Sequence, residues 1–287
     1  MDLLLQLAAD GAANGSHYAL LAIGFALIFG STGIVHFAYG PIYALAAYVG
    51  WALAAPAGLG IPLAAGATIL ITAAIGMLVY LVLYRPFEAQ GSGTFVILAA
   101  SLGLFIVASN LTGVLFGTSV RTFNDLETPI YFLGSIAIGL WQILQMVALL
   151  VVGTGLALFL GRTRWGSAIR ALADNPEMAR IVGIDTERVK VLAFALGSAI
   201  SAVAAVLILL RSGASPTMGF RAVFIAFVAV VIGGVGSLPG AAIAGLLLGL
   251  VESLGMWRIP SEWQSSIAFV LLFVTLLIRP SGLFRGR

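Results

Sequence analysis

The stretch Gly11–Tyr84, GAANGSHYALLAIGFALIFGSTGIVHFAYGPIYALAAYVGWALAAPAGLGIPLAAGATILITAAIGMLVYLVLY, decides the fold class, because its 74 residues include no Asp, Glu, Lys or Arg. One helical membrane crossing takes about 20 apolar residues. The stretch therefore holds about three crossings, which we place at His17–Val35, Gly40–Ala55 and Pro62–Tyr84. This excludes a soluble enzyme, a disordered chain and a single-pass anchor.

The composition of all 287 residues agrees, since 61 % are hydrophobic and only 9 % are charged. Soluble domains average about 45–50 % and about 25 %. The apolar runs lack the alternation and the closely spaced turns of a membrane barrel, so we expect an all-α polytopic membrane protein with one transmembrane domain over residues 1–287. The chain has no cysteine, which excludes disulfides and thiolate sites. The N-terminus lacks the positive residues of a signal peptide.

The remaining apolar runs predict further spans at Thr94–Phe116, Tyr131–Leu160, Val189–Leu210 and Trp263–Ile278, and a divided stretch at Ala222–Met256. The division is the segment Gly233-Gly234-Val235-Gly236-Ser237-Leu238-Pro239-Gly240, whose Gly and Pro residues break a helix. The divided stretch crosses the membrane either twice or once.

The basic residues favour two crossings. With two crossings there are nine spans, and an N-terminus outside puts 10 of the 14 Lys and Arg residues on the inner side together with the C-terminus. With one crossing the inner side holds 8 of the 14. Because cytoplasmic loops carry an excess of Lys and Arg, we expect a bundle of about nine transmembrane helices, within a range of 8–10.

Small residues recur every four positions at Ala241, Gly245, Gly249 and Ser253, which places them on one face of a helix. Such a face allows another helix to approach closely. Gly113-xxx-Gly117 has the same spacing. The contact is either packing within this chain, the commoner use of the pattern, or an interface with another subunit.

Ionisable groups within the spans are few: Glu252, Arg221, His17 and His36. Each lies near a predicted span end, so an interfacial role and a transport role both stay open. No carboxylate is evident near the middle of a span, where a proton- or sodium-coupled carrier would need one. Small polar residues such as Ser31 could line a path for a solute, although most such residues bond to their own helix backbone.

Several catalytic patterns are missing. A phosphate-binding loop needs a lysine after glycine, but the only lysine is Lys190, which follows Val189. Two distant histidines make a metal site improbable, and no carboxylate accompanies either of them for a Ser-His-Asp set. We therefore expect the chain to be no enzyme and to bind neither a metal nor a cofactor.

The largest polar segment between spans is the predicted inner loop at residues 162–187. Trp165–Ala173 predicts a short helix, Asn175 with Pro176 predicts the start of a second, and Gly183 is a natural stop. Asp185 is placed to cap the next span. The segment is either a docking surface or a solvated basic loop.

This loop also carries a family resemblance. Gly166–Asp185, GSAIRALADNPEMARIVGID, resembles the cytoplasmic loop of the LivH-type permeases, which are membrane subunits of branched-chain amino acid ABC importers. Gly15–Tyr48, Phe220–Ser253 and Arg279–Leu283 resemble further stretches of the same family and stand in the same order. Together they cover well over half of the chain.

The resemblance implies a permease of the bacterial inner membrane that imports branched-chain or related hydrophobic amino acids. Its partners would be a second, LivM-like permease, two ATP-binding subunits that carry ATP and Mg, and a periplasmic solute-binding protein. It would contact membrane lipid and no nucleic acid. A cleft of the ATPase would receive the inner loop, with a coupling role for Arg170, Ala171, Asp174, Asn175, Ala179, Gly183 and Ile184.

A candidate translocation path combines polar residues after the first span with the interrupted segment: Ser31, Thr32, His36, Tyr39, Gly233, Gly234, Gly236 and Pro239. The family commonly has Asn-Phe-Ala-His-Gly where this chain has His36-Phe37-Ala38-Tyr39-Gly40. The departure leaves open a related permease for urea, short amides or another small neutral solute. A stand-alone channel is a further alternative, suggested by the scarcity of buried charge.

Overall fold

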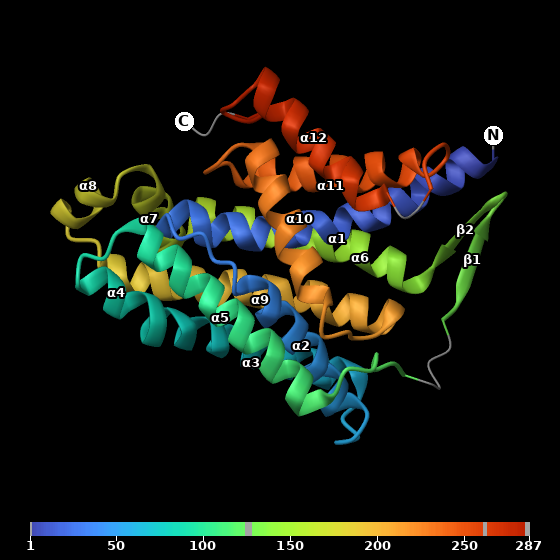
Figure 1. The fold of residues 1–287 in the computed structure, drawn as a ribbon, viewed down its shortest axis with the longest axis horizontal. Coiled ribbons are helices and arrows are strands. Elements are labelled where there is room, and N and C mark those ends of the chain that lie inside the picture. The colour runs from blue at the N-terminus through green and yellow to red at the C-terminus, as the bar shows by residue number, and fades with distance from the viewer. Residues whose placement is uncertain (1, 124–127, 261–262, 285–287) are drawn as a thin grey trace.

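The computed structural model describes residues 2–123, 128–260 and 263–284, which form a bundle of packed helices with one small hairpin (Figure 1). The elements in chain order are α1 (Asp2–Thr32), α2 (Tyr39–Ala54), α3 (Ile61–Val79), the π-helical turn η1 (Tyr80–Tyr84), α4 (Arg85–Ala89), α5 (Thr94–Phe116), β1 (Ile130–Leu133), β2 (Ile136–Gly139), α6 (Leu140–Arg162), α7 (Arg164–Asp174), α8 (Pro176–Ile181), α9 (Thr186–Ser212), α10 (Met218–Gly233), α11 (Leu238–Gly255) and α12 (Gln264–Ile278).

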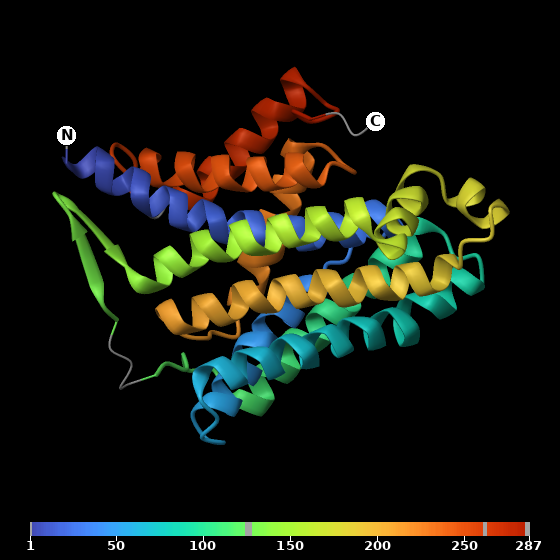
Figure 2. The same ribbon diagram turned by 180° about the vertical axis from the view of Figure 1, so that it is seen from behind.

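The long helices α1, α6 and α9 run along the long axis of the molecule, whereas α10 crosses that axis steeply (Figures 1 and 2). The N-terminus and the hairpin lie at one end, here called the hairpin end. The helices α7 and α8 lie at the other, here called the α7–α8 end. The end of α12 lies on the same half of the bundle as α7 and α8.

Nine apolar helices of 15 to 31 residues in the described chain, namely α1, α2, α3, α5, α6, α9, α10, α11 and α12, correspond to the nine predicted spans. Six helical segments are long and apolar enough to cross a membrane by length and composition, and α10 and most of α12 are apolar but shorter. The all-α polytopic architecture is thus confirmed, while nine crossings stay a prediction.

One predicted span is wrong at its start. The span placed at Tyr131–Leu160 begins as the antiparallel pair β1 and β2, and α6 starts only at Leu140. Gly134, with φ +64°, lies in the turn between the strands. The residues before Leu140 are as apolar as a span, so hydropathy alone does not separate the hairpin from the helix.

The predicted break at Gly233–Gly240 is confirmed, since α10 and α11 are separate helices. Gly234 and Gly236 join them with φ of +101° and +88°, a conformation that favours glycine. Ser237 then caps α11 by accepting a hydrogen bond from Gly240 N at 3.1 Å. Pro239 occupies the first turn of α11, where a missing N–H costs nothing.

The small-residue face of α11 packs against α1 of the same chain. A Cβ atom added at Gly245 would lie 2.6 Å from Ala19 Cα, and one added at Gly249 would overlap Gly15 Cα. The reverse also holds, because a Cβ at Gly15 would lie 2.6 Å from Leu246 O. We call this contact the α1–α11 seam; it confirms packing within the chain for Gly245 and Gly249, whereas Gly113 on α5 has nothing within 4 Å of an added Cβ.

The segment between α1 and α2 folds back into the bundle. Gly33 turns the chain with φ +71°, and the Tyr39 hydroxyl then donates a hydrogen bond to Leu21 O at 3.0 Å. His36 Nδ1 and Tyr84 Oη share a hydrogen bond at 2.7 Å, and Phe37 N donates to Ser101 Oγ at 2.7 Å. The start of α2 is therefore held deep among other helices.

The α1–α11 seam predicts that replacing glycine by alanine affects the stability of the protein differently at Gly249 and at Gly113. Gly249→Ala should lower the stability of the protein, because overpacking costs about 1–3 kcal/mol. Gly113→Ala, with open space for its methyl group, should leave stability unchanged or raise it by up to about 1 kcal/mol through helix propensity. Thermal unfolding of both variants in detergent checks this; a loss of equal size at Gly113 would contradict the seam.

Candidate functional site

The helices α7 and α8, with the start of α9, form a tightly capped unit at the α7–α8 end. Asn175 Oδ1 accepts hydrogen bonds from Glu177 N and Met178 N, each at 3.0 Å, and Asp185 Oδ1 accepts one from Arg188 N at 3.1 Å. Both caps are as predicted. The cap of α7 is Thr163, which accepts from Gly166 N at 2.9 Å. Sequence reasoning missed it, although Thr before a helix is an ordinary capping signal.

The unit is anchored to the membrane helices. An added Cβ at Gly166 would overlap Phe159 O and Leu160 Cα, so α7 lies directly on the end of α6. Lys190 Nζ lies 2.6 Å from Glu88 Oε1, and Arg85 Nε lies 2.8 Å from Glu187 Oε1. These two ion pairs join the start of α9 to α4. A displacement of the unit would therefore be transmitted to the bundle.

The predicted coupling residues divide by exposure. Helix α7 buries Ile169 and Leu172 against the bundle and leaves Arg170 and Asp174 exposed. Of the whole predicted set, the exposed members are Arg170, Asp174, Asn175 and Gly183, the half-buried ones are Ala171 and Ile184, and the buried one is Ala179. Gly183 has φ +83°, which suits its predicted place after α8. The coupling role itself stays a prediction.

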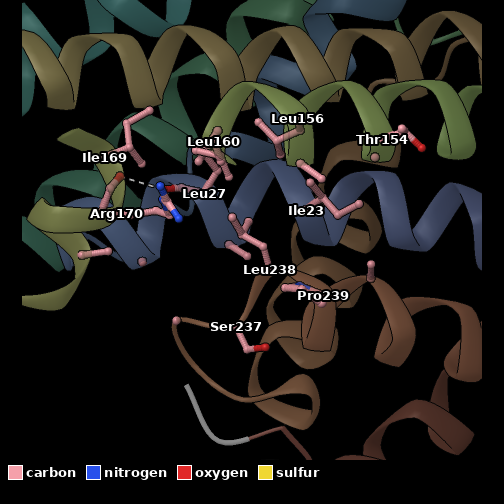
Figure 3. A pocket seen from close by; sticks show the side chains of 18 of the residues that line it. Ile23, Leu27, Thr154, Leu156, Leu160, Ile169, Arg170, Ser237, Leu238 and Pro239 are labelled. Atoms are coloured by element: carbon pink, nitrogen blue, oxygen red, sulfur yellow. Dashed lines mark hydrogen bonds between the residues drawn. The ribbon is translucent and has the colours of Figure 1, made fainter. Parts of the chain in front are cut away.

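A cavity of about 700 Å³, here called the α7 cavity, lies between α1, α6, α7 and α11 (Figure 3). Its walls are mostly apolar, with Ile23 and Leu27 from α1 and Leu156 and Leu160 from α6. Arg170 lies at its α7 side and Pro239 at its α11 side (Figure 3).

This cavity brings two predicted sets together. It is lined by Arg170 and Asp174 from the coupling set and by Ser31, Gly236 and Pro239 from the path set. The inner loop thus faces the end of α1 and the break between α10 and α11.

The other predicted path residues do not line the α7 cavity and instead pack against, or bond to, their own chain. His36 and Tyr39 are fully buried in side-chain packing, and Thr32 bonds to the carbonyl of Ile28 at 2.7 Å. Gly233 and Gly234 have no room for a side chain: a Cβ added at Gly233 would overlap the backbone of Gly240, and one added at Gly234 would overlap the carbonyl oxygen of Phe284.

The C-terminal segment caps α10. Leu283 N donates to Ile232 O at 2.8 Å and Phe284 N donates to Gly233 O at 3.1 Å, which satisfies carbonyls at the end of the helix. Gly282, with φ +81°, lies so close to Gly234 that an added Cβ would overlap it. The interrupted segment Gly233–Gly240 and the ending Arg279–Leu283 are far apart in the sequence, but they pack together as one structural unit.

The four ionisable residues of the predicted spans differ in burial, and both of the roles left open for them stay open. His17, His36 and Glu252 are at most 6 % exposed, and Arg221 alone reaches the surface. Because α1 begins at Asp2 rather than near His17, His17 lies in mid-helix, whereas Glu252 lies in the last turn of α11. Across the described residues, no group of three or more His, Cys, Asp or Glu could hold a metal ion.

Comparisons with known proteins agree on one family. The family described as "Branched-chain amino acid transport system / permease component" matches residues 7–276. The permease protein BraD of the high-affinity branched-chain amino acid transport system of Pseudomonas aeruginosa is 35 % identical over 97 % of this chain and 95 % of its own length. The corresponding LivH of Escherichia coli K12 is also 35 % identical, over 97 % of this chain and 94 % of its own.

A solved structure shows the same fold at much lower identity. PsaBC from Streptococcus pneumoniae, in complex with Fab, matches with a TM-score of 0.53 and 13 % identity, over 95 % of this chain and 91 % of that chain. At this identity the likeness concerns the fold alone.

The tail cap predicts a difference between two glycines that share a positive φ. Gly282→Ala should destabilise the protein more than Gly91→Ala, because both pay about 1–2 kcal/mol for the left-handed backbone, whereas only Gly282 also loses its contact with Gly234. Gly91 has nothing within 4 Å of an added Cβ. Thermal unfolding in detergent measures both, and equal losses would show that the tail contact contributes nothing.

Proposed function

Because the chain belongs to the family of permease components of branched-chain amino acid transport systems, we propose that it translocates branched-chain or related hydrophobic amino acids as a subunit of an ATP-driven importer. The named activity of BraD and LivH, high-affinity transport of branched-chain amino acids, supports this substrate class. The chain is a non-catalytic membrane subunit in this proposal, and ATP with Mg binds to partner subunits.

The observation that carries the proposal is the exposed apolar tip of the α7–α8 unit. Met178, Ile181 and Val182 are 55 %, 77 % and 66 % exposed, although the caps around them hold the backbone in place. A grouped set of exposed apolar side chains on an ordered segment indicates a protein partner. An ATP-binding subunit that receives α8 in a surface cleft would cover these side chains.

Coupling then follows from the packing of α7. Closure of the ATP-binding subunits pushes α8 and α7, and α7 transmits the displacement to α6 through the contact at Gly166. The side of α7 that lines the cavity faces α1 and the start of α11, so the same movement changes the α7 cavity. The bundle would alternate between inward-open and outward-open states.

The proposed assembly contains two permease chains, two ATP-binding subunits and an external solute-binding protein. The N-terminus and the hairpin face outward in this arrangement, and α7, α8 and the C-terminus face the cytoplasm. All nine apolar helices then cross the inner membrane. The departure at His36 and Tyr39 gives no support to a different solute, because both side chains are buried in packing.

Charge reversal at the α7 cavity tests the coupling. Arg170→Glu, and separately Asp174→Arg, should lower ATP-dependent uptake of leucine by proteoliposomes that contain the assembled importer. We expect at least about a tenfold loss, which corresponds to one charge-assisted hydrogen bond. Membrane insertion should not change, since both side chains are exposed.

Arg258→Glu is the matched control, because Arg258 follows α11 and lies outside the α7–α8 unit. Unchanged uptake by both α7 variants would contradict the coupling role. Uptake of urea in place of leucine would favour the alternative solute, and solute flux through this chain without ATPase would favour a stand-alone channel.

A further inference from the structure

A second cavity, of about 370 Å³, lies apart from the α7 cavity and nearer the hairpin end. Helices α1, α2, α9, α10 and α12 all contribute to its walls. Its polar and charged residues include Asn14, His17, Tyr18, Tyr43, Arg211 and Arg221, and we call it the arginine pocket. Its volume falls in the range of about 300–1,000 Å³ that is usual for small-molecule sites.

Two guanidinium groups line this pocket, and each has a carboxylate in its neighbourhood, Asp10 near Arg211 and Glu252 near Arg221. Arg211 Nη1 donates to two neutral acceptors, Asn14 Oδ1 at 2.8 Å and Gln145 Oε1 at 3.2 Å. Arg221 Nη2 donates to the Tyr18 hydroxyl at 3.1 Å and lies 3.8 Å from Glu252 Oε2. Its side chain is 51 % exposed, and a guanidinium has five N–H donors in all. A guanidinium fork of this kind binds a carboxylate through two parallel hydrogen bonds.

A buried carboxylate stands behind the same wall. The Tyr18 hydroxyl donates to Glu252 Oε2 at 2.8 Å, and Glu252 Oε1 is buried without a hydrogen-bond partner among the described residues. His17 Nδ1, on the pocket wall, is likewise buried without a described partner, while Nε2 shares a hydrogen bond with Tyr43 Oη at 3.1 Å. Buried polar atoms are rarely left unpaired, and of these two residues only His17 lines the pocket, so His17 Nδ1 suggests a polar ligand or water there.

The rest of the wall is apolar, with side chains from α1, α9 and α10: Leu21, Ile208, Met218, Ala222 and Ile225. The pocket therefore combines cationic donors with an aliphatic surface, while the Glu252 carboxylate lies behind Tyr18 and is not part of the wall. A free aliphatic amino acid carries two complementary groups, namely a carboxylate and an apolar side chain.

We propose that the arginine pocket is a solute-binding site in which Arg221, assisted by Arg211, binds the carboxylate of a free α-amino acid. The inference rests on the proposed function, because it assigns a place in this chain to the imported amino acid. In this site Arg221 acts as the carboxylate ligand and the apolar wall receives the side chain. A neutral solute such as urea would have no use for two guanidinium groups here.

Direct binding to the assembled transporter in nanodiscs, without the external solute-binding protein, tests the site. Radiolabelled L-leucine should bind saturably, and 4-methylpentanoate, which keeps the carboxylate, should compete better than isopentylamine, which lacks it. Arg221→Gln should weaken leucine binding about ten- to a hundredfold and abolish the advantage of 4-methylpentanoate. Arg221→Lys should recover part of the affinity, and Arg258→Gln should bind as the unmodified protein does.

A protection experiment does not require the removal of an arginine. The chain has no cysteine, so Ser212→Cys places a single thiol on the pocket wall, and Ser92→Cys places one in a different cavity near α4 as the control. Leucine should slow the reaction of a small methanethiosulfonate reagent at position 212 and not at position 92.

The outcomes separate this inference from the proposed function. ATP-dependent leucine uptake together with unchanged leucine binding by Arg221→Gln, or without protection at position 212, would overturn the pocket and leave the importer intact. Absence of saturable leucine binding to the unmodified complex would also overturn it. Absence of leucine uptake altogether would instead contradict the proposed function.

Discussion

The backbone contact between α1 and α11 is the interaction on which the rest of the structure depends. Between helices in a membrane, lipid tails remove the hydrophobic driving force, so close packing and hydrogen bonds hold the bundle together. Gly15 on one helix and Gly245 and Gly249 on the other bring the two backbones into direct contact. The seam joins segments more than 200 residues apart and fixes the centre of the fold.

The α7 cavity borders this contact, and the arginine pocket lies beside α1 on the other side of Tyr18. The α7 cavity lies between α1 and the start of α11, and the arginine pocket is lined by α1 near Tyr18, whose hydroxyl bonds to Glu252 on α11. The break between α10 and α11 is closed in turn by the C-terminal segment at Gly282. The α7 cavity therefore lies against a closely packed pair of helices.

What could be predicted from the sequence was mainly local. The caps at Asn175 and Asp185, the break after Gly233 and the close-packing face at Gly245 depend on neighbouring residues, and all are present in the structure. The family resemblance rests on the same stretches. The partner of the packing face could not be predicted, because spacing shows that a helix approaches closely but not which helix does so.

The features that could not be predicted depend on contacts between residues distant in sequence, or lie in apolar segments that could form either a helix or a hairpin. The hairpin before Leu140 is apolar enough to continue a span, and only its pairing distinguishes it. The burial of His17 depends on where α1 begins. The pairings of Tyr18 with Glu252, of Arg211 with Asn14 and of the tail with Ile232 each join residues distant in sequence, so no local pattern signals them.

If this chain works as one subunit of a larger importer, driven through the α7–α8 unit, it should purify together with its partners. The test is gentle affinity purification of the chain from its native membrane, followed by mass spectrometry of the proteins that accompany it. We expect recovery of ATP-binding subunits together with a related permease. Recovery of the chain alone, as a stable self-oligomer, would contradict it and leave the exposed tip of α8 without a partner.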